Sequence, residues 1–420
     1  MVDIVVIGGG AAGCIAAIKA AEAGASVTLI EKNAKIGRKI MITGKGHCNI
    51  TNAKKWSDFS VHVHNKPSFF KPAFYNFSND DTIDFFESHG VETVLTRDQR
   101  IYPKSMSAAS VVDALAGAIE KAGVQVLFNC DVANVTFDEE KGCFETDYVE
   151  TINLRVAAGR VQSAAVIVAT GGLSYPSTGS TGAGYDIARR FGHTVQRTFP
   201  SLTALVPAGY DMRLRDITLV NTTVQLFVGH DMVACEFGDI QFTDGGLEGP
   251  VGFKISRKAV WALINGNKVS VSIDLKPAVP LQLLKERVAR EAEEFGINAV
   301  NFNKKIRAFL RKFMPQALID PYVESNALTL GNLAAKMKDW RMAIVDYVGW
   351  RRAVVTAGGV NLEEVVARSM ASRNRPGLFF AGEVLDIDCD TGGYNLQFAF
   401  STGALAAKGA VEFVNKAKES

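Results

Sequence analysis

Three glycines and one acid near the start of the chain have the spacing of a dinucleotide-binding turn. Gly8, Gly10 and Gly13 follow the pattern G-x-G-x-x-G, and Glu31 comes about twenty residues later. In such a turn the first glycine permits a tight bend, the second lets the backbone approach a pyrophosphate, and the third lets a helix pack closely on a strand. The later acid can accept hydrogen bonds from ribose hydroxyls. These residues therefore predict a dinucleotide site.

The elements that such a turn requires occur in the right order. Residues 3–7 form an apolar run, as expected of a strand buried on both faces. Alanine-rich residues 11–23 predict a helix, and residues 27–30 predict a second buried strand that ends at Glu31. The helix N-terminus would offer free N–H groups and the positive end of its dipole to phosphates. We therefore favour a dinucleotide site over an ordinary glycine-rich turn.

A basic, glycine-containing segment follows at residues 32–52. Arg38 and Lys39 could pair with a pyrophosphate, and Gly44 and Gly46 would let the backbone approach a flat ring. A solvated basic loop is the alternative interpretation. The polar residues crowded beside these glycines favour a binding site: Thr43, His47, Asn49, Thr51 and Asn52.

Two later apolar runs also end in glycines. Residues 166–172 predict a buried strand, and residues 377–383 predict another that ends at Gly382 and Glu383. A helix predicted over 396–411 begins just after glycines, so its N-terminus is a second place for an anionic or electron-rich group. The C-terminal part of the chain is therefore expected to return to the nucleotide.

The pattern changes in the middle of the chain. Alternating apolar and polar residues predict half-buried antiparallel strands over 194–280, and residues 281–350 are mainly helical and charged. We therefore predict an α/β fold with a discontinuous, Rossmann-like domain over 1–193 and 351–420. An inserted β-rich and helical domain is predicted over 194–350.

The composition bounds the class of protein. A chain of 420 residues, 47% hydrophobic and 21% charged, is typical of a soluble globular protein of two or three domains. The formal net charge of +2 argues against nucleic acid and anionic membranes as partners, and no apolar run is long enough to span a bilayer. The six cysteines form no C-x-x-C pair, which argues against a zinc site. We expect a cytoplasmic protein without a signal peptide or metal.

Six segments in order along the chain resemble one protein family. They are residues 37–52, 100–105, 169–185, 242–250, 356–360 and 381–403. They look like the signatures of the BaiN/YhiN-type flavoproteins, also described as NAD(P)/FAD-dependent or aminoacetone-oxidase-like oxidoreductases, within the glutathione-reductase-like class of FAD proteins. The resemblance spans nearly the whole chain and implies an FAD cofactor. The chain departs from the residues usual in related proteins at four positions: His47, Ala183, Asp244 and Cys389.

The resemblance implies which residues contact FAD, in the two chain ends and the strand end between them. They are Gly8, Gly10, Ala11, Ala12, Gly13, Glu31, Lys32, Arg38, Lys39, Thr43, Gly44, Gly46, Cys48, Asn49, Val132, Ala169, Thr170, Gly171, Gly382, Glu383, Asp386, Gly393, Tyr394, Asn395 and Leu396.

Four residues are candidates for moving a proton to or from a substrate. His47, Arg100, Tyr175 and Tyr394 each lie in a motif expected near the flavin ring. For the tyrosines the alternative is simple packing. Cys48 and Cys389 are expected to be structural, because nothing in the sequence marks a reactive thiolate.

The resemblance implies an FAD-dependent oxidoreductase that transfers hydride through flavin N5 on a small organic or lipid-like substrate. NAD(P)H is the expected transient donor, although no second G-x-G-x-x-G predicts a separate domain for it. Two alternatives remain: an RNA-modifying or RNA-binding flavoprotein, supported by basic residues at 32–45 and 304–312, and an oxidase of a small amine that uses oxygen. A non-catalytic flavin scaffold is a further possibility. The sequence predicts no oligomeric state.

Overall fold

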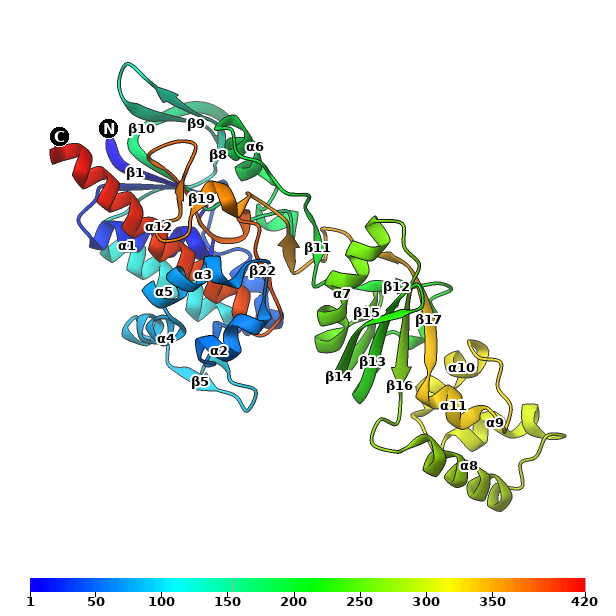
Figure 1. The fold of residues 1–420 in the computed structure, drawn as a ribbon. Coiled ribbons are helices and arrows are strands. Elements are labelled where there is room, and N and C mark those ends of the chain that lie inside the picture. Colours follow the sequence, from blue (N-terminus) through cyan, green and yellow to red (C-terminus); the bar gives the residue numbers. More distant parts are fainter. Residues whose placement is uncertain (154, 420) are drawn as a thin grey trace. The chain divides into compact units, whose positions relative to one another are not determined.

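The computed structural model describes residues 1–153 and 155–419, which form two compact units (Figure 1). One unit contains both chain ends, Met1–Phe199 and Val354–Ser420, and the other is Pro200–Ala353. The predicted fold class, a discontinuous Rossmann-like domain with an inserted β-rich and helical domain, is confirmed. No helix in these described ranges is long and apolar enough to cross a membrane.

The first unit is built on a nine-stranded sheet with a parallel centre. The parallel strands lie in the order β21-β10-β1-β2-β7. Their bounds are β1 (Val2–Ile7), β2 (Val27–Ile30), β7 (Gln125–Leu127), β10 (Arg155–Val168) and β21 (Leu378–Phe380). Antiparallel strands extend the sheet: β8 (Cys130–Asp138), β9 (Cys143–Ile152), β19 (Val365–Val366) and β20 (Ala371–Ser372).

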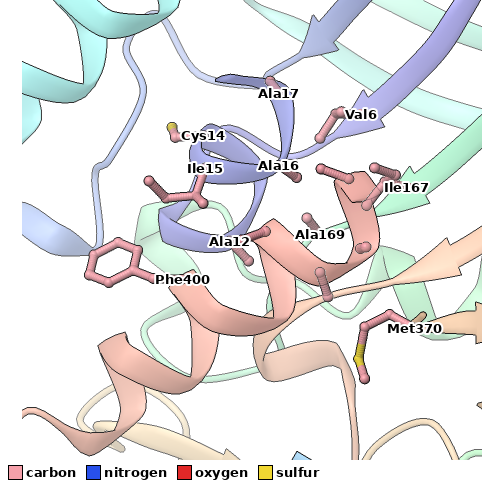
Figure 2. Packing of buried hydrophobic residues seen from close by; sticks show 14 of the residues in the cluster. Val6, Ala12, Cys14, Ile15, Ala16, Ala17, Ile167, Ala169, Met370 and Phe400 are labelled. Carbon is pink, nitrogen blue, oxygen red and sulfur yellow. The ribbon is translucent and has the colours of Figure 1, made fainter. Parts of the chain in front are cut away.

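Two helices pack against each other beside the centre of this sheet. Helix α1 (Ala11–Glu22) follows β1, and α12 (Tyr394–Glu419) closes the chain. Figure 2 shows small α1 side chains, such as Ala12 and Ala16, in the core with Phe400 of α12. The predicted helix over 396–411 is therefore too short. It begins at Tyr394, and charged, exposed residues with good helix propensity extend it beyond the buried part.

Short elements complete this unit. The helices are α2 (Trp56–Phe59), α3 (Pro67–Asn76), α4 (Asn79–Ser88), α5 (Ala108–Lys121) and α6 (Ala183–Arg190), and the 3-10 turns are η1 (Ile40–Gly46), η2 (Ser60–His62), η3 (Pro176–Thr178), η5 (Leu362–Glu364) and η6 (Gly382–Val384). Two small sheets pair β3 (Thr51–Asn52) and β5 (Thr93–Leu95) with β6 (Arg100–Pro103), and β4 (Val63–His64) with β22 (Asp388–Cys389). Strands β11 (Phe199–Ser201) and β18 (Val355–Ala357) lie where the chain leaves and re-enters the unit.

The second unit contains a closed six-stranded barrel in the order β12-β15-β14-β13-β16-β17. Its strands are β12 (Leu205–Pro207), β13 (Thr218–Val228), β14 (Asp231–Thr243), β15 (Gly246–Glu248), β16 (Val269–Asp274) and β17 (Trp340–Tyr347). The helices are α7 (Gly249–Ile264), α8 (Leu281–Phe295), α9 (Phe302–Leu310), α10 (Gln316–Glu324) and α11 (Leu333–Lys338), and the turn η4 is Met212–Leu214. The glycine-rich segment 242–252 reads as a turn in sequence, but it contains β15 and the start of α7.

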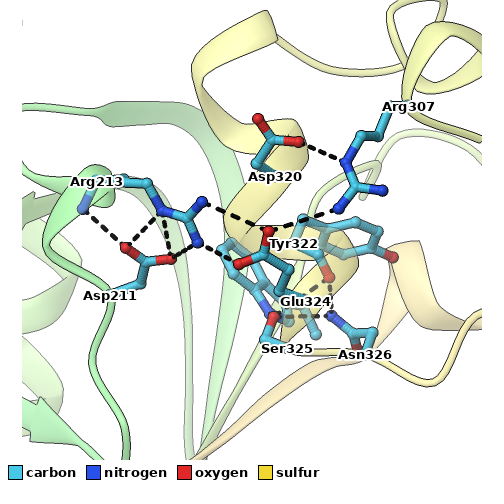
Figure 3. A network of polar contacts seen from close by, with 9 residues as sticks. Asp211, Arg213, Arg307, Asp320, Tyr322, Glu324, Ser325 and Asn326 are labelled. Atoms are coloured by element: carbon cyan, nitrogen blue, oxygen red, sulfur yellow. Dashed lines mark hydrogen bonds and ion pairs between the residues drawn. The ribbon is translucent and has the colours of Figure 1, made fainter.

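A chain of charged groups joins the barrel side of this unit to its helices (Figure 3). Arg213 contacts Asp211 and Glu324, and Glu324 also faces Arg307. These side chains are partly to half exposed, so solvent screens the pairs and each contributes little to stability. The buried rings of Tyr322 and Trp340, 5.4 Å apart, provide the apolar contact behind them.

The contact between α1 and α12 generates a stability prediction. A Cβ atom at Gly403 would lie 2.3 Å from the carbonyl oxygen of Ala12, so Gly403→Ala should destabilise the protein by about 2 kcal/mol in a chemical denaturation curve. Gly117→Ala in α5 is the matched control, because a Cβ there meets nothing within 4 Å. This control should raise stability by about 0.5 kcal/mol. Equal effects of the two substitutions would contradict the packing argument.

Candidate functional site

A long cavity opens at the carboxyl ends of strands β1, β10 and β21. Its empty space is about 1340 Å³, counting the open mouth. Its lining combines the glycine turn, the basic segment and the start of α12, as an extended dinucleotide would require. Ligands of open α/β sheets bind at such strand ends, so the location agrees with the glycine turn that follows β1.

The turn after β1 leaves no room for side chains except toward the cavity. A Cβ at Gly8, where φ is +101°, would lie 2.7 Å from the Ala169 carbonyl oxygen, and one at Gly13 would lie 1.8 Å from the Gly8 oxygen. A Cβ at Gly10 would meet nothing within 4 Å. No side chain caps α1 and no acid occupies its first turn, so its N–H groups are free for an anion. The turn therefore fits a pyrophosphate.

Glu31 is held at the end of β2 by backbone and side-chain donors. Its Oε2 accepts a hydrogen bond from Gly9 N–H at 2.7 Å, and its Oε1 accepts from the backbone N–H of Asn33 at 2.8 Å. The Asn33 amide also donates to Oε1 and accepts a hydrogen bond from Arg38 at 2.7 Å. Asn33 was not among the predicted site residues. An asparagine two residues after Glu31 is typical of a turn, and its position could have indicated a role there.

Lys39 and Glu383 connect the basic segment to the end of β21. Lys39 Nζ lies 2.8 Å from Glu383 Oε2, and Ser174 Oγ and Thr356 N–H donate to Oε1. Burial alone would raise the pKa of Glu383, but the charge of Lys39 and these hydrogen bonds outweigh it and lower the pKa. The segment predicted as a basic loop is thus fixed against the cavity rather than freely solvated.

The N-terminus of α12 forms another wall of the cavity. Asn395 and Leu396 line it, and the Asn395 amide bonds both the N–H and the carbonyl oxygen of Cys389 at 2.9 Å. In the amide orientation that satisfies its surroundings, Asn49 accepts a hydrogen bond from Gly393 N–H at 3.0 Å. The first turn of α12 holds no acidic residue, and its N-terminal end borders the cavity at Asn395 and Leu396.

Of the four proton-transfer candidates, the structure brings Arg100 and Tyr394 together. A Cβ at Gly392 would lie 3.0 Å from the Tyr394 ring and 3.8 Å from Arg100 Nε. Burial raises the pKa of Tyr394, which keeps its hydroxyl protonated. His47 is exposed, with Nδ1 2.7 Å from the Met106 carbonyl oxygen, and Tyr175 begins the η3 turn in a left-handed conformation.

Most of the predicted cofactor residues line the cavity. They are Gly8, Gly10, Ala11, Ala12, Glu31, Lys32, Arg38, Lys39, Thr43, Val132, Ala169, Thr170, Gly171, Gly382, Glu383, Asn395 and Leu396. The others do not line it: Gly13, Gly44, Gly46, Cys48, Asn49, Asp386, Gly393 and Tyr394. Gly13 lies under the turn, and Cys48 is fully buried, with its pKa raised to about 11 by burial.

Several lining residues were missed. They are Gly9, Asn33, Ile40, Cys130, Asp131, Thr178, Gly179, Ser180, Val354, Val355 and Phe398, among others. Thr178, Gly179 and Ser180 belong to the glycine- and serine-rich stretch after β10, whose composition was the available signal. Gly9 lies inside the glycine motif and Asn33 two residues after Glu31, so both had a local signal. The remaining apolar and acidic residues and Cys130 are brought to the cavity only by the folded chain. Within the described ranges no group of His, Cys, Asp and Glu could hold a metal ion.

Comparisons with known proteins identify the family of the chain. Residues 2–409 match the family described as HI0933-like protein Rossmann domain. The chain is 31% identical to the 3-dehydro-bile acid delta(4,6)-reductase of Clostridium scindens, over 97% of this chain and 98% of that protein. It is also 31% identical to the ribosomal RNA dihydrouridine synthase of Escherichia coli, over 97% of both chains. A solved 3-ketosteroid delta1-dehydrogenase from Sterolibacterium denitrificans shares the fold, with a TM-score of 0.50 and 12% identity over 98% of this chain and 99% of that one.

A binding prediction follows from Glu31. Glu31→Gln removes the charge that would accept ribose hydroxyls, so the affinity of the apoprotein for FAD should fall about tenfold to a hundredfold. Titration of the apoprotein with FAD, followed by flavin fluorescence, measures it. Glu22→Gln, an exposed change on α1, is the control and should bind FAD as the wild type does. Equal affinities of the two variants would contradict a ribose contact.

A pH prediction follows from Glu383. Because its pKa is lowered in the folded protein, its stabilisation is present above the ordinary glutamate value of 4.5 and is lost as the pH falls below it. Glu383→Gln should therefore lower the free energy of unfolding by about 2 kcal/mol near pH 7, and by less near about pH 3.5. Denaturation curves at the two pH values test this. If Glu383→Gln lowers the free energy of unfolding as much in acid as near neutral pH, the ion pair with Lys39 is not the source of the loss.

Proposed function

The chain belongs to the HI0933-like family of FAD-dependent flavoproteins and is an oxidoreductase, and we propose that it reduces a carbon–carbon double bond conjugated to a carbonyl group. The observation that carries the proposal is the chemistry shared by two relatives with different substrates. A delta(4,6)-reductase of a 3-dehydro-bile acid saturates an unsaturated ketone, by its name. A dihydrouridine synthase adds two hydrogens to uridine, whose ring double bond is also conjugated to a carbonyl.

The cavity has the parts that FAD needs. The glycine turn and the N-terminus of α1 would hold the pyrophosphate, and Glu31 would hold a ribose hydroxyl. Lys39 and Glu383 would fix the wall between them. Bound FAD supplies hydride acceptance and donation at N5. The positive end of α12, at Asn395 and Leu396, would stabilise negative charge on the reduced ring by about 1 kcal/mol.

Arg100 and Tyr394 are suited to bind the substrate's carbonyl oxygen. Arg100 keeps its proton at ordinary pH, so it can stabilise developing negative charge but cannot serve as a proton donor. The Tyr394 hydroxyl stays protonated and, within the part of the chain that the structure describes, has no hydrogen-bond partner. Together they would stabilise the enolate that forms when hydride adds to the double bond.

We propose a small organic or lipid-like molecule as the substrate and NAD(P)H as the electron donor. The net charge of +2 gives little general attraction for a phosphate backbone. Ribosomal RNA is the second candidate, because relatives named ribosomal RNA dihydrouridine synthase at 31% and 29% identity cover nearly the whole chain. Oxidation of a small amine by oxygen has no comparable support.

The function predicts two separable reactions of the purified protein. Its flavin absorption should bleach anaerobically with NADH or NADPH, and the reduced flavin should be reoxidised by 2-cyclohexenone, an unsaturated ketone, or by unmodified ribosomal RNA. Reoxidation by RNA that weakens steeply with salt would favour the second candidate. Bleaching by a small amine with oxygen uptake would indicate an oxidase. A protein that binds no flavin would refute the proposal.

A further inference from the structure

The partly buried carboxylate of Asp390, four residues before the start of α12, contacts two histidines. Asp390 Oδ2 lies 2.9 Å from Nδ1 of His62, and Oδ1 lies 2.9 Å from Nε2 of His64. The side chains of Asp390 and His62 are 15% and 19% exposed. Burial alone would raise the pKa of Asp390, but the hydrogen bonds from both histidines outweigh it, so the carboxylate stays charged.

The two histidines differ in what their second nitrogen faces. Nδ1 of His62 faces Asp390, and Lys54 Nζ lies 2.9 Å from its Nε2. An ammonium has only donors, so this contact is a hydrogen bond when Nε2 carries the lone pair. His64 faces the same carboxylate and no lysine. Lys54, His62 and Asp390 thus form a directed chain from a partly exposed ammonium to a partly buried carboxylate. At catalytic sites an imidazole that faces a reacting group is usually oriented by a third group.

Lys54 has an unusual partner for a surface lysine. In the described ranges no carboxylate lies within ion-pair distance of its Nζ, and the imidazole of His62 takes that place. A neighbouring carboxylate would favour the charged form of the lysine and so hold its proton. An imidazole can orient the lysine nitrogen without that charge attraction. The ammonium and the amine both carry N–H groups, so His62 can orient Lys54 before and after it loses a proton.

This chain is joined to the cavity wall through the start of α12. The Asn395 amide, which lines the cavity, donates to the Asp390 carbonyl oxygen at 3.2 Å. The His62 ring stacks on Tyr394, with ring centroids 4.4 Å apart, and Lys54 Nζ lies 5.8 Å from the Tyr394 ring centroid. Six titratable or charged groups face His62 and Tyr394: Lys54, His64, Asp390, Arg100, Asp98 and Cys389.

We propose that Lys54 is the proton donor of the reaction and that His62, oriented by Asp390, is its positioning residue. This rests on the proposed function. Hydride adds to the carbon remote from the carbonyl, and the electron pair of the double bond moves to the carbonyl oxygen. The enolate then takes a proton from Lys54 Nζ at the carbon next to the carbonyl. Lys54 is left as an amine that regains its proton from water.

The kinetic test separates the two half-reactions of the flavin-loaded protein. Lys54→Arg keeps the charge but cannot release a proton, so reoxidation of the reduced flavin by 2-cyclohexenone or ribosomal RNA should slow about 10²-fold. Flavin reduction by NAD(P)H should be unchanged. His62→Gln should slow the same step, whereas His64→Gln, which keeps a donor to Asp390, should not. Methylammonium should partly restore the rate of Lys54→Ala, which a purely structural lysine would not allow.

A second readout does not depend on turnover. Nitrogen-15 NMR of the histidine side chains should show the Nδ1–H form of His62, and Lys54→Met should shift the Nε2 signal of His62 but not the signals of His64. An unchanged His62 signal would overturn the contact. If the wild type and Lys54→Arg reduce a substrate equally fast, the donor role of Lys54 is overturned, but the proposed function is not. If neither 2-cyclohexenone nor ribosomal RNA reoxidises the reduced flavin of the wild type, the proposed function is overturned, and the donor role with it.

Discussion

Helix α1 is confined between the turn that follows β1 and helix α12, with no room for a side chain at either contact. Gly13 meets the Gly8 carbonyl on one side, and Gly403 meets the Ala12 carbonyl on the other. This close approach sets where α1 begins, and therefore where its free N–H groups lie. It also brings the last helix of the chain beside the first. The cavity exists because two helix N-termini are brought to the carboxyl ends of the same parallel strands.

The parts of the site that the sequence predicts are those with a local pattern. Gly8, Gly10 and Glu31 are close in the chain, and their spacing follows from the geometry of one β-α-β unit. The contact of Lys39 with Glu383 joins residues 344 positions apart, and that of His62 with Asp390 joins residues 328 positions apart. Nothing in the local pattern indicates such pairs. Closure of the barrel was also beyond prediction, because alternation marks strands but not which strands are neighbours.

Relatives with different named substrates are almost the same length as this chain. The alignment with the bile acid reductase covers 97% of this chain and 98% of the other, and the RNA-modifying relative is covered as fully. A change of substrate in this family therefore requires no added domain. The change of substrate must come from different side chains at equivalent positions of the same fold. If the polar residues around Glu31 and Glu383 hold the cofactor as proposed, the remaining surface of the cavity mouth and the inserted unit are left to differ.

The discontinuity of the first unit has a consequence for how the protein is made. Strand β10 lies between β1 and β21, and β21 and α12 are the last elements to leave the ribosome. Translation proceeds at about 5–20 residues per second, and domains fold as units while it continues. The barrel unit is complete long before the cavity is. A nascent chain can therefore complete its cavity only after the residues that follow the barrel unit, up to Ala399, have been made.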